Sequence, residues 1–200
     1  MGVTCVVSWP PPAGKTWSQA ADLLQQRLEL LGAKKTGMWS VDCEAYQLQS
    51  GSKLLHLVRN SEQPHACYGI LDSGTCITTD RSFEQIMAKL GNYYQPGKGA
   101  HTEAKGQRYI LGDNVVKVGA VTVGQVAKGL VVEVDFVPSV DPSYCWKGLA
   151  SFVKRLLDGS VEVDEQPPVP ISKDGTFKPI DTSRQYVAVF SELRAAKAAS

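Results

Sequence analysis

Two carboxylates, Glu133 and Asp135, stand two residues apart in an apolar run of alternating pattern. Successive side chains of a strand point to opposite faces, so these two carboxylates share one face. Paired carboxylates can hold a divalent cation or carry out acid–base chemistry. They can equally form the solvent-exposed face of an amphipathic strand, with Lys117 and Lys128 nearby as ion-pair partners. The sequence favours the second interpretation, a solvated face without a catalytic or metal site.

The segment 12–16 (Pro-Ala-Gly-Lys-Thr) lies between an expected strand and an expected helix, which is the setting of a phosphate-binding loop. Trp9 stands where that motif requires its leading glycine, and the prolines at 10–12 lack the N–H groups that would bind phosphate. Thr16 and Gln19 instead have the spacing of a helix capping box. The sequence therefore predicts no nucleotide site here.

The remaining nucleophilic and metal-binding residue types are scattered. His56, His65 and His101 have no aspartate or cysteine at a ligand-like offset, and neither Ser73 nor Ser151 lies in a nucleophile elbow. A catalytic triad assembles only in space, so the sequence neither proposes nor excludes one. The five cysteines form no C-x-x-C pair, which predicts reduced thiols packed as small hydrophobic side chains. We expect no catalytic residue, no metal and no cofactor.

A glycine-rich stretch carries basic residues interleaved with tyrosines, a pattern that can bind single-stranded nucleic acid. Its basic members are Lys98, His101, Lys105 and Arg108, and its aromatic members are Tyr93, Tyr94 and Tyr109. The whole chain has 21 basic and 20 acidic residues, for a net charge of +1, whereas nucleic-acid binders usually show a basic excess. We therefore interpret residues 97–106 as a mobile surface loop and expect no direct, sequence-specific contact with nucleic acid.

Length and composition predict one intracellular domain. The 200 residues are 43% apolar and 20% charged, which is average for globular proteins and excludes wholesale disorder or a fibrous repeat. The longest uninterrupted apolar run is Tyr186–Phe190, whereas a membrane-spanning helix needs about 20 residues. The first residues have no basic, apolar leader, so the sequence predicts no signal peptide and no membrane partner.

Hydrophobic periodicity predicts four helices among short strands. Helices are expected from the Thr16 cap to Gly32, from a Ser82–Gln85 capping box to Gly91, from an Asp141 cap to Gly159, and over residues 186–193. Strands are expected at 3–8, 38–48, 53–59, 66–71, 75–79, 108–111, 115–123 and 130–137.

Strands that follow one another without β-α-β alternation favour an α+β fold with an antiparallel sheet. About eight strands suffice to close a small barrel, so we predict an antiparallel barrel flanked by four helices, in a single domain over residues 1–200. Residues 160–183 are rich in acidic residues and proline, and we expect an exposed linker before the last helix. The two-faced apolar strand 115–123, Trp9 and Trp39 are compatible with a partner surface or with cover by the chain's own helices.

Short motifs in a fixed order resemble the Mediator subunit 20 family. The motifs are MGVTCV at 1–6, LELLGA at 28–33, VDCE at 41–44, NSE at 60–62, VKVG-x-VT-x-G at 116–124, G-x-x-VEV at 129–134 and CW at 145–146. A weaker match covers the last helix through Tyr186, Phe190 and Leu193-Arg194. Each motif alone is common, but their order from residue 1 to about 157 is specific. The prolines at 10–12 and residues 160–183 depart from the family pattern.

The resemblance implies a small antiparallel barrel and a nuclear, non-enzymatic subunit of the Mediator head module. It implies direct pairing with Mediator subunit 18, attachment to the head through subunit 8, and an indirect role in transcription by RNA polymerase II. No site residue is implied, and the partner interface stays unknown. The alternative is an enzyme, because the head-module barrels are similar in fold to metal-dependent tunnel triphosphatases. Only Glu133 and Asp135 offer carboxylates for such a tunnel.

Overall fold

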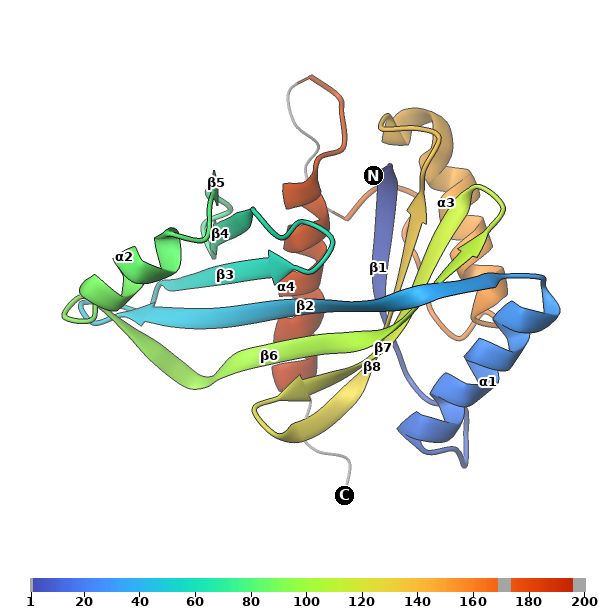
Figure 1. The fold of residues 1–200 in the computed structure, drawn as a ribbon, viewed down its shortest axis with the longest axis horizontal. Coiled ribbons are helices and arrows are strands. Elements are labelled where there is room, and N and C mark those ends of the chain that lie inside the picture. The colour runs from blue at the N-terminus through green and yellow to red at the C-terminus, as the bar shows by residue number, and fades with distance from the viewer. Residues whose placement is uncertain (1, 169–173, 196–200) are drawn as a thin grey trace.

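The computed structural model describes residues 2–168 and 174–195, with residues 98–100 described by their backbone only. Eight antiparallel strands form one sheet in the order β1-β8-β7-β6-β2-β3-β4-β5. The strands are β1 (Val3–Trp9), β2 (Lys34–Leu48), β3 (Leu54–Asn60), β4 (Cys67–Leu71), β5 (Cys76–Thr79), β6 (Tyr94–Leu111), β7 (Asn114–Val123) and β8 (Val126–Phe136). The sheet coils strongly, so that β1 and β8 run across the direction of β2 and β3 (Figure 1). The predicted antiparallel, barrel-like α+β fold is confirmed, as a half-barrel with β1 and β5 at its two ends.

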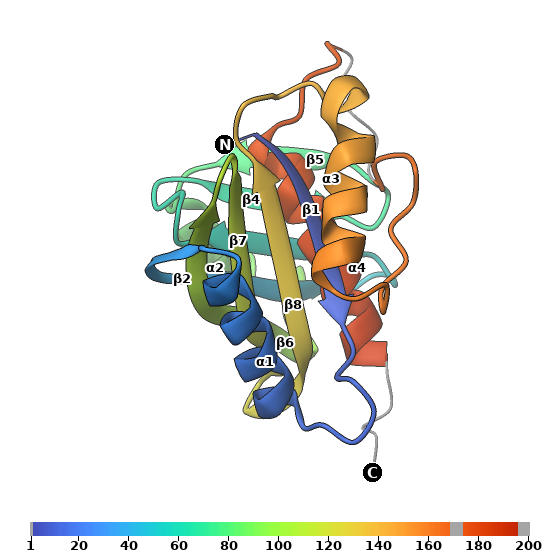
Figure 2. The ribbon, with the colours of Figure 1, turned by 90° about the vertical axis from the view of Figure 1, so that its right-hand side faces the viewer.

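Four helices cover both faces of the sheet: α1 (Trp17–Leu30), α2 (Phe83–Lys89), α3 (Pro142–Leu156) and α4 (Pro179–Ala195). We call the face packed against α1 and α3 the convex face and the face packed against α4 the concave face. Figure 2 shows α1 and α3 on the viewer's side of the sheet, while α4 runs behind β1. Because α4 contacts β1 and β8 as well as β3 and β4, it fills the hollow between the two ends of the sheet.

Local signals at the helix ends explain most boundaries. Thr16 forms the predicted capping box with Gln19, and Gly32 takes a φ of 83° just beyond α1, a conformation that glycine adopts without strain. Asp141 caps α3 as predicted by accepting the Ser143 N–H. The capping box predicted for Ser82 is wrong, because its side chain makes no cap bond to α2 and donates to Asp80 instead.

The mobile loop predicted at residues 97–106 is wrong. These residues belong to β6, which pairs with β2 on one side and β7 on the other. The glycines that suggested a loop allow close packing within the sheet. Gly106 lies directly opposite Gly119, and a Cβ on Gly106 would clash with the Val118 carbonyl. A Cβ on Gly119 would clash with the Lys105 carbonyl and lie 3.0 Å from Cζ2 of Trp39, so Gly119 also makes room for the indole.

The apolar strand 115–123, Trp9 and Trp39 are covered by other parts of the same chain. Trp9 is buried in the convex core and its indole N–H donates to Ser160 Oγ at 2.9 Å. Trp39 is buried in the concave core, where its ring lies 6.1 Å from that of Tyr186 in α4. The two faces of β7 are likewise covered, Val116 in the convex core and Val121 in the concave core. None of these residues is therefore free for a partner.

The segment 160–183 differs from the exposed linker expected for it. Val163 and Phe177 are buried in the convex core, and the backbone N–H of Phe177 donates to the carbonyl of Val140 at 2.7 Å. The last helix begins at Pro179 rather than near Tyr186, because Asp181 accepts the Lys178 N–H and closes the first turn. Residues 169–173 lie outside the described part of the chain.

Candidate functional site

Two neighbouring side chains of α4 tie together the two ends of the open sheet. Gln185 accepts the N–H of Val6 at 2.8 Å and donates to the carbonyl of Thr4 at 2.7 Å, both on the free edge of β1. Arg184 donates to the carbonyl of Gly74 and to Cys76 Sγ, each at 3.0 Å, at the β4–β5 hairpin. Polar bonds from α4 thus connect β1 and β5, which are not hydrogen-bonded to each other.

A charged network lies beneath α4, buried at Lys117, Glu133 and Tyr186 and open to solvent at Glu62 and Arg108. Lys117 of β7 donates to Glu133 of β8 at 2.7 Å and also binds Glu62, which follows β3. Glu62 in turn accepts from Nε of Arg108 at 2.7 Å. The hydroxyl of Tyr186 on α4 donates to the second oxygen of Glu133. The network therefore joins three strands, one loop and the helix.

The prediction of a solvated carboxylate face is wrong. Glu133 is 1% exposed and Asp135 is 6% exposed, because α4 and the chain start cover the face they share. Lys117 is the cation that pairs with Glu133, rather than Lys128. Asp135 has a different partner, the N–H of Gly2 at 2.8 Å. The two carboxylates share a strand face as expected, but each has its own structural role.

Burial and neighbouring charges set the protonation of this network. Burial alone would lower the pKa of Lys117, but the carboxylates of Glu133 and Glu62 outweigh burial and raise it. Burial would raise the pKa of Glu62, but Lys117 and Arg108 lower it. Burial, reinforced by the charge of Glu133, raises the pKa of Tyr186 well above its ordinary value. At neutral pH the phenol is thus a hydrogen-bond donor and the lysine is a cation.

Burial also raises the pKa of Asp135, and the bond from Gly2 opposes this shift only in part. A carboxyl group with a raised pKa can act as a general acid when a substrate reaches it. Here its Oδ1 is already occupied by a backbone N–H, and the residue is buried. Asp135 is therefore best explained as an anchor for the start of β1.

A cysteine, a histidine and an aspartate lie in series, an arrangement that the sequence alone did not propose. Cys43 Sγ is 3.9 Å from His56 Nδ1, and His56 Nε2 is 3.2 Å from Asp72 Oδ1. This order is that of a thiol nucleophile, its base and an orienting acid. The register of the β2–β3 hairpin, in which Ala45 lies opposite His56, is the signal that could have placed Cys43 and His56 together.

The environment of Cys43 opposes nucleophilic chemistry. Its side chain is fully buried, and burial raises the pKa of its thiol to about 11, so the thiol stays protonated at neutral pH. Burial also lowers the pKa of His56, which favours the neutral imidazole. Arg194 of α4 covers the sulfur at 3.5 Å. The series is accordingly a packed polar cluster beneath α4.

The other sequence candidates lie apart from one another. Segment 12–16 forms a turn before α1, closed by a bond from the Lys15 N–H to the Pro12 carbonyl. His65 is exposed, and His101 lies 3.2 Å from Asp42 on the surface. Ser73 Oγ and Ser151 Oγ each bond within their own turn or helix.

The basic stretch does not act as a unit. Arg108 pairs with Glu62 at the partly exposed end of the charged network, while Lys105 is exposed on β6. The side chain of Lys98 lies outside the described residues. Across residues 2–168 and 174–195, no three histidine, cysteine, aspartate or glutamate side chains are grouped so that they could hold a metal ion. In the same residues no helix has the length and apolar character needed to cross a membrane.

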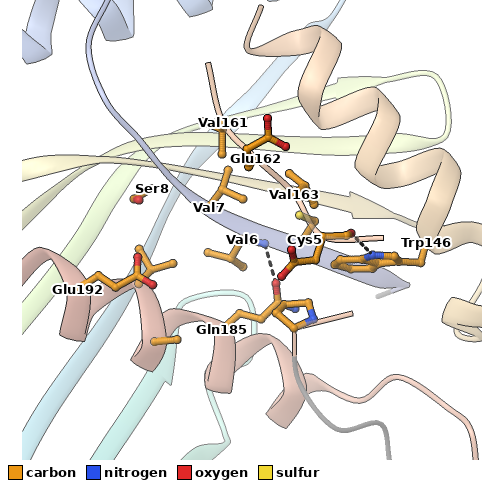
Figure 3. A pocket seen from close by; sticks show the side chains of 14 residues that line it. Cys5, Val6, Val7, Ser8, Trp146, Val161, Glu162, Val163, Gln185 and Glu192 are labelled. Atoms are coloured by element: carbon orange, nitrogen blue, oxygen red, sulfur yellow. Dashed lines mark hydrogen bonds between the residues drawn. The ribbon is translucent and has the colours of Figure 1, made fainter. Parts of the chain in front are cut away.

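Two of the hollows on the surface of the described residues lie beside apolar side chains. One, of about 220 Å³, runs beside the free edge of β1 between residues 161–164 and α4 (Figure 3). The other, of about 370 Å³, lies between the end of β8 and the start of α3, lined by Phe136, Tyr144 and Phe152 among others. Tyr144 is 87% exposed, and Val137 and Val140 beside it are about half exposed. These exposed apolar side chains form one candidate contact surface.

The fold and its interior define a class: a small α+β half-barrel whose buried charges hold a helix inside a coiled sheet. A family model described as "TATA-binding related factor (TRF) of subunit 20 of Mediator complex" matches residues 1–191. The chain is 38% identical over 203 aligned residues to mouse Mediator of RNA polymerase II transcription subunit 20, covering 97% of this chain and 95% of that one. The Drosophila melanogaster protein of the same name is 31% identical, with 97% and 86% covered.

The chain therefore belongs to the Mediator subunit 20 family, as the sequence motifs predicted. A chain in the structure of the Schizosaccharomyces pombe Mediator head module is similar to it with a TM-score of 0.44 and 13% identity. That likeness covers 78% of this chain and 93% of the other. The identification rests on the sequence relatives and the family model, which both span nearly the whole chain.

Proposed function

We propose that this protein is a non-enzymatic assembly subunit of the nuclear Mediator head module, which pairs directly with Mediator subunit 18. Subunit 8 would attach this pair to the rest of the head, and the complex would support regulated transcription by RNA polymerase II. The single observation that carries the proposal is the family match over residues 1–191. The interior supports a non-enzymatic role. The charged residues beneath α4 bind each other and Tyr186, and Cys43 contacts His56, so these side chains have structural partners.

The test is coexpression with subunit 18 followed by size-exclusion chromatography with light scattering. We expect a 1:1 complex, and a stable pair of this kind buries at least about 1,200 Å² in total. Tyr144 is a good first target, since it lies among exposed apolar side chains beside α3. Tyr144→Asp should weaken the pair if that surface takes part, while Tyr93→Asp changes another exposed tyrosine that does not line this hollow. Independent migration of the two purified chains at micromolar concentration would contradict the pairing.

A further inference from the structure

The free edge of β1 is only partly satisfied. β1 ends the sheet, and the bonds from Gln185 to Thr4 and Val6 show that alternate residues direct their peptide groups away from β8. Ser8 belongs to the same set by strand alternation. Among the residues that the structure describes, Gln185 alone is recorded as a partner of this edge. The carbonyl of Val6 and the N–H and carbonyl of Ser8 remain available to an added strand.

The hollow beside β1 gives such a strand a place to lie. Its floor is the strand edge itself, with Val7 and Ser8 only half buried. One wall is the segment 161–164, fixed by the indole N–H of Trp146, which donates to the carbonyl of Asp164 at 2.9 Å. The opposite wall is α4, which contributes Ala188 and Glu192 beyond Gln185 (Figure 3). The opening therefore follows the edge of β1 between two walls.

The hollow beside β1 is acidic, which favours a positively charged ligand. Glu162, Asp164 and Glu192 are among its lining residues, and no lysine or arginine is. Glu162 has one exposed cation nearby, Lys154, at 3.0 Å. A second copy of the chain pairing edge to edge would bring the same carboxylates together, and like charges destabilise such pairs. The acidic lining thus disfavours self-pairing and favours a basic segment.

We propose that the outer edge of β1 binds an extended, basic segment of a partner polypeptide as an added strand. Main-chain bonds form with Val6 and Ser8, and lysine or arginine side chains of the segment meet Glu162 and Glu192. Gln185 marks one end of the site, because its amide already occupies the edge at Thr4 and Val6 as a peptide group would. This surface lies apart from Tyr144, and the proposal holds whether or not subunit 18 is a partner.

The test is an NMR titration of the ¹⁵N-labelled full chain with a blocked peptide of alternating lysine and valine, up to about 1 mM. We expect shifts centred on the amides of Val7, Ser8 and Ala188, and slower hydrogen exchange at Ser8. Two control peptides separate the contribution of charge from that of main-chain hydrogen bonds. One carries glutamate in place of lysine and should bind at least tenfold more weakly. The other is N-methylated at alternate residues, cannot pair with a strand, and should produce no protection at Ser8.

Two variants test the site from the protein side. Glu192→Lys should weaken binding of the lysine peptide about fivefold, the effect of losing one exposed ion pair, whereas Glu29→Lys makes the same charge change on α1 and should leave binding unchanged. Ser8→Pro removes the edge N–H at a position where an edge strand tolerates proline and should abolish binding. If Ser8→Pro fails to fold, the N-methylated peptide still removes the same bond from the other partner.

Four results of the peptide titrations would overturn the proposal. They are no shift at the highest peptide concentration, equal binding of the acidic peptide, undiminished binding of the N-methylated peptide, or shifts confined to another surface. A dimer of the chain alone that dissociates in Ser8→Pro would assign the edge to self-association instead and would equally reject a basic partner segment.

Discussion

The two faces of the same sheet are held by different physical means. On the convex face, α1 packs Ala20, Leu24 and Leu28 against apolar side chains of β7 and β8 such as Val118 and Val132. On the concave face, α4 also buries Tyr186 and Phe190, but its position is set by polar bonds from Gln185, Tyr186 and Arg194. The convex face is an apolar core, and the concave face is an apolar core with a charged centre.

This difference indicates that the convex face mainly contributes stability, while the concave face determines the position of α4. Apolar burial is non-directional and proportional to area, so the convex face stabilises α1 without defining one register sharply. Buried hydrogen bonds and charges are directional, and they are costly when unmatched. Glu133 with Lys117 contributes little net stability compared with an apolar pair, yet its geometry permits one placement of Tyr186. The concave face therefore fixes where α4 lies.

The largest effect is expected from breaking the buried charge pair on one side only. Lys117→Met leaves Glu133 buried without its cation, and such a change costs about 3–5 kcal/mol of unfolding free energy. Denaturant unfolding followed by circular dichroism measures the loss. A cost below about 1 kcal/mol would mean that the concave face tolerates an uncompensated charge, which would remove the contrast between the two faces.

The matched control is the double variant Lys117→Met with Glu133→Leu. It removes both charges, so it should recover most of the stability lost in the single variant. Its α4 should nevertheless be less firmly placed, because Tyr186 loses its acceptor. Hydrogen exchange across residues 180–193 distinguishes this outcome: protection should fall in the double variant even where global stability returns.

The convex face should respond to truncation in the manner of an ordinary apolar core. Leu28 is fully buried between α1 and the sheet. Leu28→Ala should cost about 3 kcal/mol, from lost burial and the cavity left behind. The loss is measured by the same unfolding curves, while exchange in α4 relative to the global transition should stay unchanged. Selective loosening of α4 would show that the two faces are coupled through the sheet.

The sequence predicted the convex face well, because its pattern is local. The helix stripe of Leu24 and Leu28, the Thr16 and Asp141 caps and the alternating residues of β8 each follow from near neighbours. The concave face was predicted poorly. The covering helix is separated by many residues from the strands that it covers, so Glu133 had the appearance of a solvent-facing residue. Nothing within one strand indicates that a distant tyrosine will bind its carboxylate.

The same reason explains the wrong loop prediction at β6, and why the sequence could not propose the cysteine–histidine series. Gly106 is one of the glycines that suggested a loop, and only its pairing with Gly119 across two strands explains its lack of a side chain. Cys43, His56 and Asp72 come together through hairpin register rather than through spacing in the sequence. The family motifs succeeded where patterns failed, because they identify the whole chain without needing to place each residue.

A smaller effect is expected at the rim of the concave face, where α4 meets β1. Gln185→Ala leaves the carbonyl of Thr4 and the N–H of Val6 without partners and should cost about 1–2 kcal/mol. Gln185→Glu keeps the acceptor for the Val6 N–H but buries a carboxylate opposite the Thr4 carbonyl, so it should cost more global stability than the alanine variant while Val6 keeps its local bond. Hydrogen exchange at Val6 should accelerate in the alanine variant and much less in the glutamate variant. Equal exchange in both would mean that water replaces the amide at this edge.

The smallest effect is a dependence of stability on pH that arises from the concave face through His56. Burial lowers the folded-state pKa of His56 below its unfolded value near 6.5, although Asp72 opposes the shift. Above about pH 6.5 both states hold the neutral ring, so the group has no pH effect there. As the pH falls below that value the unfolded chain takes up a proton before the folded chain does, and stability falls by at most about 1.4 kcal/mol per pH unit.

Unfolding curves between about pH 7 and about pH 5.5 should show this decline, and His56→Asn, which cannot titrate, should flatten it. An unchanged slope in that variant would assign the decline to other groups and would leave the convex and concave faces alike in their response to acid.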